Sequence, residues 1–384
     1  MITFLIISVI SLMISAGFSQ TIPRDSMYLG QVTPGDVPVI FQLGVRPGHF
    51  AAEWIAVTAD GKDIYYSEIE GYYPIRSARI KKYSFANGNW TGPFVLFENF
   101  FSPALSVTGD IMYLENGTAE AYFSVKRNSQ WSVPEKILSK LLTVHYLQVT
   151  HKGTFYISSK VPNNEGLGDW CKLDLSDSDT IATGLGMPLN TVWDNLDFFI
   201  SRDEAFIIAT TPFGLAISYQ KINGTWTNPR KLGSKINFGL GMWGPYITPD
   251  NKYLFYSTGT NQDYSDVNVY WVRIDHLIDS LKYTNIPPYA RNKIKIPDGI
   301  AGMIYRYTIP DDIFFDEDGD TTFTYSANLI DGTPLPSWLN FNTATKAFSG
   351  TPPEAGEIRI ILTATDADNS QGIGVFKLSI TDKP

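Results

Sequence analysis

Cysteine is almost absent from this chain of 384 residues, and Cys171 is its single example. One cysteine excludes an internal disulfide framework and any cysteine-rich metal cluster. Histidine is also scarce, with 4 residues, so a histidine-based zinc site or a Ser-His-Asp triad has few candidates and no recognisable motif. No glycine-lysine loop of the phosphate-binding kind is present.

Charge is low as well. Charged residues make up 18% of the sequence, and 30 basic against 39 acidic side chains give a net charge of −9. This balance argues against a phosphate-binding surface, so we expect no nucleic-acid partner. Hydrophobic residues account for 43% and aromatic residues for 14%, which excludes a disordered chain. At roughly 100 to 200 residues per domain, the length indicates a globular protein of about two domains.

Long apolar runs are confined to the N-terminus, where residues 2–14 precede the small residues Ala16, Gly17 and Ser19. The run falls short of the roughly 20 residues that span a bilayer, and it resembles a secretory signal cleaved after Ser19. No Lys or Arg precedes it, which leaves an uncleaved, membrane-associated anchor as the alternative. We expect an exported protein, in the periplasm, on the cell surface or secreted, without a transmembrane helix once residues 1–19 are removed.

Five segments share a polar turn followed by alternating aromatic and branched residues, and they begin at Val57, Val107, Val149, Ile200 and Ile247. Asp-Gly and Pro-Asp pairs form turns, whereas runs such as Ile-Tyr-Tyr and Leu-Phe-Tyr favour strands, so each segment predicts an antiparallel hairpin. Repeats of about 40 to 50 residues with four strands each are typical of β-propeller blades.

A second motif, Asn-x-x-Trp-(Thr/Ser)-x-Pro, starts at residues 87, 128 and 223 and precedes a short apolar strand. The last repeat lacks this strand, and residues 37–45 lie where such a strand would stand before the first repeat. We therefore expect the N-terminal segment to complete the last blade, which removes a free sheet edge. The sequence predicts a five-bladed propeller, with six blades as the alternative if residues 163–190 contain another.

The segments TADGKDIYYS from Thr58 and TPDNKYLFYS from Thr248, with VNVYWV after Asp266, resemble the TolB-type, WD-like β-propeller repeat proteins. The resemblance covers about residues 28–283. It implies a protein-interaction or ligand-binding scaffold, without shared catalytic residues to transfer. The predicted propeller domain is 20–283.

Residues three and four positions before each repeat are expected at the central channel of the propeller. Two carboxylates, Glu53 and Asp197, with His145 beside them in register, would suit a propeller glycoside hydrolase. The competing interpretation is that these carboxylates bind backbone donors or face channel water. The aromatic residues expected to stack on a ligand are Trp54, Tyr146 and Trp243.

After the proline-containing linker at 284–290, the residue pattern of the sequence changes. About seven short alternating segments within about 100 residues predict an antiparallel β-sandwich of immunoglobulin-like size over 291–384. This part lacks cysteine, so a true immunoglobulin domain is not expected. Residues 286–384 hold 13 acidic and 8 basic side chains, and thus −5 of the total charge of −9.

Acidic residues cluster in the run Asp316-Glu-Asp-Gly-Asp. Carboxylates at positions i, i+2 and i+4 repel one another unless a cation or water screens them, and oxygen-rich sites suit calcium. The run is not an EF-hand loop, because its glycine precedes Asp320 and its twelfth position is Ala327. An acidic surface turn is the alternative.

The strings FDEDGDTTFTYSA from Phe315, LPSWLNFN from Leu335 and LTATDADNSQG from Leu362 resemble the dystroglycan-type, cadherin-like sandwich over about residues 288–382. The resemblance implies a Ca²⁺ site next to the linker. Its implied ligands are Asn285, Asp316, Asp318 and Asp366, with Asp320 and Asp368 as second choices. We expect an exported, non-enzymatic binding or scaffold protein that contacts a protein or a glycan at the cell envelope, with a glycoside hydrolase or related carbohydrate-active enzyme as the alternative.

Overall fold

The computed structural model describes most of the chain. The described residues are 21–71, 75–141, 143–161, 168–175, 180–191, 195–290 and 294–383. The predicted signal segment, 1–19, lies outside them. None of the helices in these ranges has the length and apolarity needed to cross a membrane. The longest, α1 (Asp275–Leu281), has 7 residues, and two short 3₁₀ turns, η1 (Arg24–Ser26) and η2 (Tyr28–Gly30), lie near the N-terminus.

The chain forms two compact units, which are described separately. The first contains the described parts of Met1–Ser159, Cys171–Thr183 and Phe238–Ile274. The second contains those of Lys160–Trp170, Gly184–Asn237 and Asp275–Pro384.

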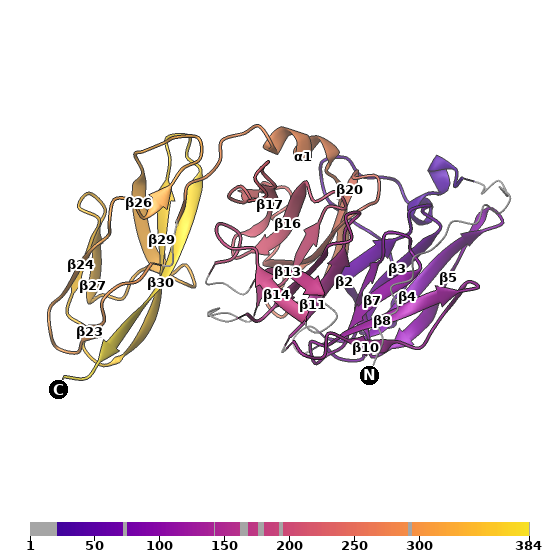
Figure 1. The fold of residues 1–384 in the computed structure, drawn as a ribbon, viewed down its shortest axis with the longest axis horizontal. Helices are drawn as coiled ribbons and strands as arrows, with labels where there is room; N and C mark the ends of the chain where they lie inside the picture. The colour runs from indigo at the N-terminus through magenta and orange to yellow at the C-terminus, as the bar shows by residue number, and fades with distance from the viewer. Residues whose placement is uncertain are drawn as a thin grey trace. The chain divides into compact units, whose positions relative to one another are not determined.

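Five small antiparallel sheets lie between residues 39 and 273 of the described chain (Figure 1). The first comprises β2 (Phe50–Val57), β3 (Asp63–Ile69), β4 (Arg79–Ala86) and β5 (Asn89–Glu98); the second β6 (Phe101–Leu105), β7 (Ile111–Glu115), β8 (Ala121–Arg127), β9 (Gln130–Trp131) and β10 (Glu135–Ile137). The third comprises β11 (His145–Val149), β12 (Phe155–Ser159), β13 (Asp169–Leu175) and β14 (Thr180–Gly184); the fourth β15 (Phe198–Ile200), β16 (Phe206–Thr211), β17 (Gly214–Tyr219) and β18 (Arg230–Lys231). The fifth comprises β19 (Gly241–Ile247), β20 (Tyr253–Gly259), β21 (Asn268–Arg273) and β1 (Val39–Ile40).

These sheets are antiparallel units of the kind found in propellers, four of them with four strands and the second with five. The predicted all-β architecture is confirmed: a β-propeller followed by an immunoglobulin-like sandwich. The number of blades stays a prediction, because residues 162–167, 176–179 and 192–194 lie outside the described chain.

The repeated polar turns fold as the sequence predicts. A threonine hydroxyl group stabilises each of the two turns at Thr58 and Thr248. Thr58 Oγ1 accepts the backbone N–H of Asp63 at 3.0 Å and donates to Asp60 at 2.7 Å. The equivalent Thr248 accepts from Tyr253 N at 3.1 Å. Such side-chain bonds to the local backbone stabilise a turn between two strands.

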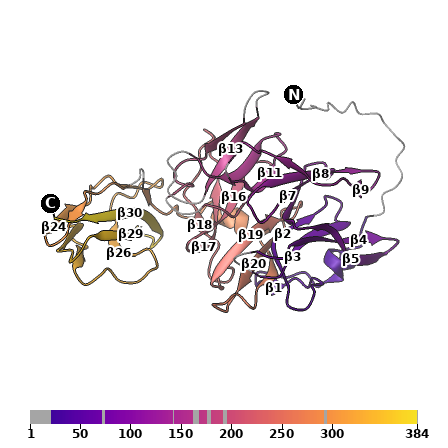
Figure 2. The ribbon, with the colours of Figure 1, turned by 90° about the horizontal axis from the view of Figure 1, so that it is seen from below.

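The inner strands carry β-bulges at one equivalent point. The pairing register shifts in β2, β6, β11 and β19, and in each strand one bulge residue has a left-handed backbone: Glu53, Ser102, Tyr146 and Gly244 (φ between 51° and 63°). Neighbouring inner strands contact one another in the order β19, β2, β6, β11, and Figure 2 shows β19 beside β2. Each bulge bends its strand; it adds one unpaired residue in β6, β11 and β19 and two in β2.

The positions of the bulges show that the alignment of the repeats counted along the sequence was wrong. That alignment placed Glu53 with His145 and Trp243. In the structure Glu53 is equivalent to Tyr146 and Gly244 instead. The reason is that the paired stretch between bulge and turn is one residue longer in β2 than in β11 or β19.

The predicted closure by the N-terminal segment is confirmed. β1 pairs antiparallel with β21, with Val39 opposite Trp271 and Ile40 opposite Tyr270. Next to β1, the ring of Phe41 lies 5.1 Å from those of Phe255 and Trp271. The first and last described strands of the propeller thus share one sheet.

Glu68 on β3 is a fully buried carboxylate with two cationic partners. Its oxygens lie 2.7 Å from Arg46 Nε and 2.8 Å from Lys81 Nζ, and the backbone N–H of Arg46 also donates to it. Burial alone would raise the pKa of Glu68, but these bonds outweigh burial and hold the pKa below its ordinary value of 4.5.

We therefore expect acid sensitivity that depends on Glu68. A carboxylate whose pKa is lowered by folding stabilises the fold above its unfolded pKa, and this stabilisation is lost as the pH falls through the folded value. Urea unfolding measured across pH 3 to 6 should show the free energy of unfolding decreasing with acid, with a smaller slope in Glu68→Gln. Glu98→Gln is the control, because Glu98 pairs with Arg79 at the surface and exposed pairs contribute little. Equal slopes in wild type and Glu68→Gln would contradict the prediction.

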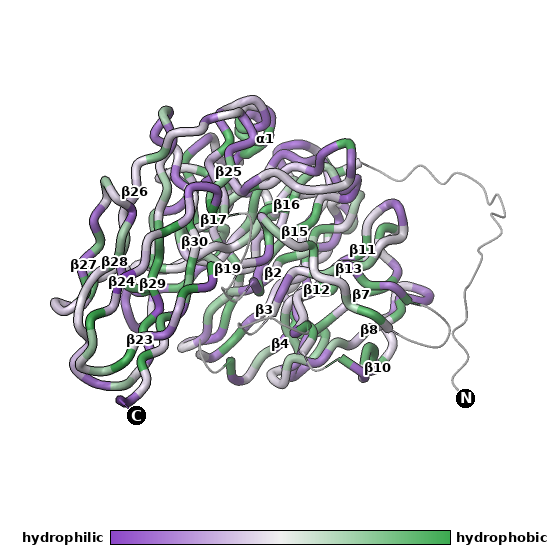
Figure 3. The backbone as a smooth tube through the Cα atoms, turned by 60° about the vertical axis from the view of Figure 1, so that its left-hand side comes forward, coloured by the Kyte–Doolittle hydropathy of each residue, from purple (hydrophilic) through white to green (hydrophobic). Residues whose placement is uncertain are grey.

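The C-terminal module is a sandwich around an aromatic and aliphatic core, and its described strands pair antiparallel except for β23 (Gly299–Ile300), which runs parallel to β30 (Gln371–Thr381). One sheet has the order β23 (Gly299–Ile300), β30 (Gln371–Thr381), β29 (Gly356–Thr365), β26 (Thr324–Leu329); the other has the order β24 (Tyr305–Thr308), β28 (Ala347–Gly350), β27 (Leu339–Asn342); and β22 (Tyr289–Ala290) pairs with β25 (Phe314–Phe315). Phe348, Leu362 and Phe376 are at most 3% exposed within this core. Hydrophobic residues concentrate in the strands of both units (Figure 3).

Candidate functional site

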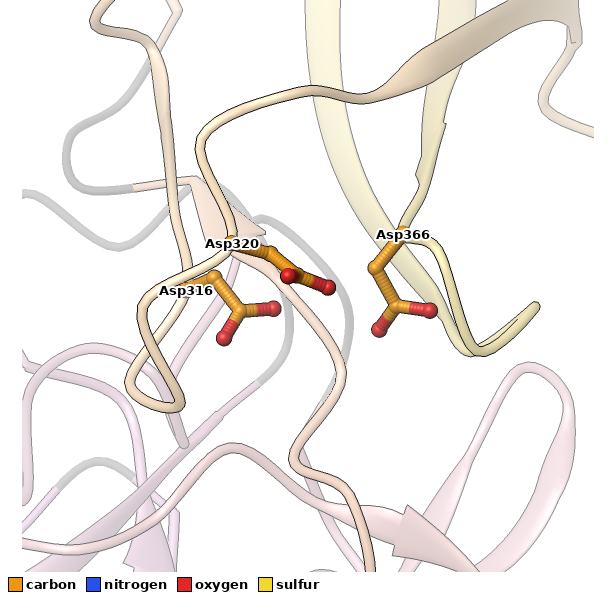
Figure 4. A group of neighbouring side chains, drawn as sticks. All are labelled: Asp316, Asp320 and Asp366. Atoms are coloured by element: carbon orange, nitrogen blue, oxygen red, sulfur yellow. The ribbon is translucent and has the colours of Figure 1, made fainter.

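Three carboxylates meet at one end of the C-terminal module. Asp316 and Asp320 lie in the loop that follows β25, and Asp366 directly follows β29. One oxygen from each lies within 4.8 Å of the others, and Figure 4 shows the three carboxyl groups facing a common space. Asp316 and Asp366 are buried, with 3% and 6% exposure. Two nearly inaccessible negative charges thus lie side by side.

One oxygen of Asp316 is left without a hydrogen-bond partner. Its Oδ1 accepts the backbone N–H of Asp318 at 2.7 Å, whereas Oδ2 is buried and accepts no hydrogen bond from the described residues. A buried carboxylate oxygen without a donor is unfavourable. Burial raises the pKa of Asp316, and the carboxylates of Asp318, Asp320 and Asp366 raise it further, against the opposing effect of the Asp318 N–H. A cation at this point would satisfy the oxygen and offset the repulsion.

The linker reaches the same cluster. Asn285 Nδ2 donates to Asp366 Oδ2 at 2.8 Å, and the N–H of Ile286 donates to Asp318 Oδ2 at 2.5 Å. The other Asp366 oxygen accepts the N–H of Ser370 at 2.8 Å. Linker and sandwich loops therefore hold one another in place around the acidic group.

The structure brings three of the four predicted ligands together: Asn285, Asp316 and Asp366. The fourth, Asp318, is turned to the linker backbone, and Asp320, the second choice, takes its place in the group. Gly319, between them, has a left-handed backbone (φ 98°), which redirects the chain before Asp320. Asp368 is exposed and is not one of the three grouped carboxylates.

This set of donors suits a hard divalent cation. Calcium takes six to eight oxygen ligands from carboxylates, amide and backbone carbonyls and water. The three carboxylates and the amide oxygen of Asn285 would supply part of such a shell.

The aromatic residues predicted for the propeller channel lie in its interior. Tyr146 Oη donates to Glu53 Oε2 at 2.5 Å, and the rings of Trp54 and Tyr146 are 5.0 Å apart. Glu53, Trp54 and Tyr146 are 4%, 2% and 6% exposed. The structure thus joins these three residues, and all three are buried.

Trp243 and Asp197 do not belong to the group formed by Glu53, Trp54 and Tyr146. Trp243 is 8% exposed and packs with Ala52 and Phe101, with its ring 5.2 Å from that of Tyr264. Asp197 belongs to the second unit, whereas Glu53 belongs to the first. Its backbone carbonyl accepts the N–H of Thr210 at 2.9 Å.

Glu115 is a functional candidate that the sequence did not single out. It ends β7, is 3% exposed, and its carboxylate accepts the N–H of Tyr146 and binds His145 Nδ1, each at 2.8 Å. No local motif marks it, because a glutamate at a strand end is unremarkable in sequence. Glu115 reaches His145 and Tyr146 because β7 and β11, which belong to successive repeats, contact one another.

Comparisons with known proteins concern the two parts separately. No curated protein matches the sequence. TolB from Acinetobacter baumannii is similar over 57% of this chain and 56% of its own, with 16% identity and a TM-score of 0.38; this chain therefore spans little more than half of that protein. The extracellular domain of a putative hybrid two-component system from B. thetaiotaomicron matches over 86% of this chain and 44% of its own, with 12% identity and a TM-score of 0.35.

A putative 6-phosphogluconolactonase from Bacteroides fragilis NCTC 9343 matches over 89% of this chain and 87% of its own, with 12% identity and a TM-score of 0.34. Residues 287–381 match the family model described as a putative Ig domain. The C-terminal module is thus immunoglobulin-like, and its dystroglycan-type, cadherin-like character stays a prediction.

Proposed function

We propose that this chain is an exported binding or scaffold protein whose C-terminal module holds a calcium ion and whose propeller binds a protein or a glycan at the cell envelope. The observation that carries the proposal is the buried, unpartnered oxygen of Asp316 within a group of three carboxylates. A cation is the simplest partner for that oxygen. The apolar N-terminal run supports export.

A binding role agrees better with the propeller than hydrolysis does. A glycosidase needs two carboxyl groups that reach the substrate. Glu53 is 4% exposed and is hydrogen-bonded to the Tyr146 phenol. The aromatic residues that would have stacked on a sugar, Trp54 and Trp243, are buried.

Calorimetric titration of the full chain with CaCl₂ tests the proposal. We expect one ion per chain with a Kd of about 10⁻⁴ to 10⁻³ M, the range of extracellular modules. The melting temperature should also rise, because an ion at about 100 times its Kd stabilises the folded state by about 2.7 kcal/mol.

Asp316→Asn should abolish the heat of binding and the thermal shift, because it removes a charge from the centre of the group. Asp331→Asn is the matched control in the same module, since Asp331 is an exposed turn residue that binds only the backbone and side chain of Thr333. An unchanged melting temperature at about 10 mM calcium, or equal loss in both variants, would overturn the calcium site.

A further inference from the structure

The second unit contains a cavity of about 470 Å³. Its walls come from Thr211 and Ala216 of the fourth sheet, from the two residues of β18, from the linker, and from residues 369–373 at the start of β30. A volume of roughly 300 to 1,000 Å³ is usual for small-molecule sites. The cavity is therefore large enough for a ligand of one or two sugar rings.

The charge of the cavity wall is opposite to that of the chain. Arg230 and Lys231 line it, and none of its described lining residues is Asp, Glu or His. The chain as a whole carries 39 acidic residues and a net charge of −9. A wall that excludes acidic side chains in such a protein favours an anionic ligand.

The two cations differ in exposure and in their contacts. Arg230 is 5% exposed; its Nε and Nη2 donate to the carbonyls of Asn285 (3.2 Å) and Thr284 (3.0 Å), and its guanidinium lies 5.6 Å from the ring centre of Tyr219. Lys231 is exposed, and its ammonium lies 5.1 Å from the ring centre of Phe213, another lining residue. Arg230 gives the wall a fixed positive charge, and Lys231 is the cation able to reach a ligand.

The uncharged wall offers both partners that a sugar ring requires. Exposed amide side chains, which donate and accept hydrogen bonds, are contributed by Asn369 and Gln371. Apolar faces are contributed by Phe213 and Pro212. Amides complement hydroxyl groups, and ring faces pack against the C–H face of a sugar.

We infer that this cavity binds a sugar acid, a hydroxylated ring that bears one carboxylate. The carboxylate pairs with Lys231 in the field of Arg230, the hydroxyl groups bond to the amides, and the ring packs on Phe213. None of the three grouped carboxylates lines the cavity, and Asn285 is the one proposed calcium ligand that does.

Titration of the full chain with D-glucuronate and D-galacturonate tests the inference, with D-glucose and acetate as matched probes that lack the charge or the ring. At least one uronate should bind saturably, one per chain, at least about tenfold tighter than glucose and acetate. The result should hold in chelator as well as in calcium. Failure of both uronates to bind would overturn the inference, as would equal binding of glucose or of acetate.

Lys231→Gln should weaken uronate binding about three- to sixfold, the effect of losing one exposed charge pair. Lys235→Gln is the control, because Lys235 is exposed on the same segment and does not line the cavity. Both variants should keep the wild-type melting temperature, since neither side chain is buried. Equal weakening by the two substitutions would overturn the assigned contact.

Discussion

Replacing Trp271 with alanine is expected to lower the free energy of unfolding by about 3 to 5 kcal/mol, the usual range for a buried tryptophan. Trp271 is 1% exposed, and its ring lies 5.4, 5.1 and 5.5 Å from those of Tyr28, Phe41 and Phe255. Two of these neighbours belong to the N-terminal segment that completes the last sheet. Urea unfolding followed by tryptophan fluorescence and circular dichroism measures the loss.

The same substitution should also release the N-terminal segment. We expect trypsin to cut Trp271→Ala faster than wild type at Arg24 and Arg46, because the segment between them loses its packing partner. Phe94→Ala is the control, since Phe94 on β5 is 56% exposed, and it should change stability by less than about 1 kcal/mol. A loss as small in Trp271→Ala would contradict the role given to the aromatic cluster.

Replacing Gly244 with alanine is expected to cost about 2 to 5 kcal/mol, from two separate causes. Gly244 has a left-handed backbone (φ 55°), which strains any residue with a Cβ. That Cβ would also lie 2.6 Å from the carbonyl carbon of Glu53, a backbone atom rather than the end of a flexible side chain. Thermal and urea unfolding of the purified variant measure the effect.

Gly153→Ala separates the two causes. Gly153 has the same left-handed conformation (φ 76°), but a Cβ added at this residue would meet no other atom within 4 Å. It should cost only about 1 kcal/mol. Equal losses in the two variants would show that the close approach of β19 to β2 contributes nothing.

The strands, their turns and the closure were predictable from sequence because their signals are local. A threonine that caps a turn at Thr58 or Thr248 is followed by alternating aromatic residues, and this pattern survives between repeats. The bulges were not predictable, since Glu53, Ser102, Tyr146 and Gly244 share a backbone conformation but no chemistry. A register counted along the sequence therefore fails by one residue between β2 and either β11 or β19.

The acidic cluster was predictable in position but not in detail. The spacing of Asp316, Asp318 and Asp320 places all three in one loop, whereas the choice between the last two depends on the turn at Gly319 and on the linker N–H that occupies Asp318. The burial of the aromatic residues was not predictable either. Trp54 and Trp243 would have the same sequence pattern whether they line a channel or fill a core. The structure buries both.

The pairing of β1 with β21 has a consequence for how the chain acquires its fold. Val39 on β1 pairs with Trp271 on β21. The sheet can therefore be completed only after almost the whole propeller has been synthesised. Contacts between such distant residues slow folding, because a long loop has to close before any pairing energy is gained. Until then β21 presents an unpaired edge to any other extended chain. Truncation before Phe41 should therefore trap aggregation-prone molecules even though every other blade-forming segment is intact.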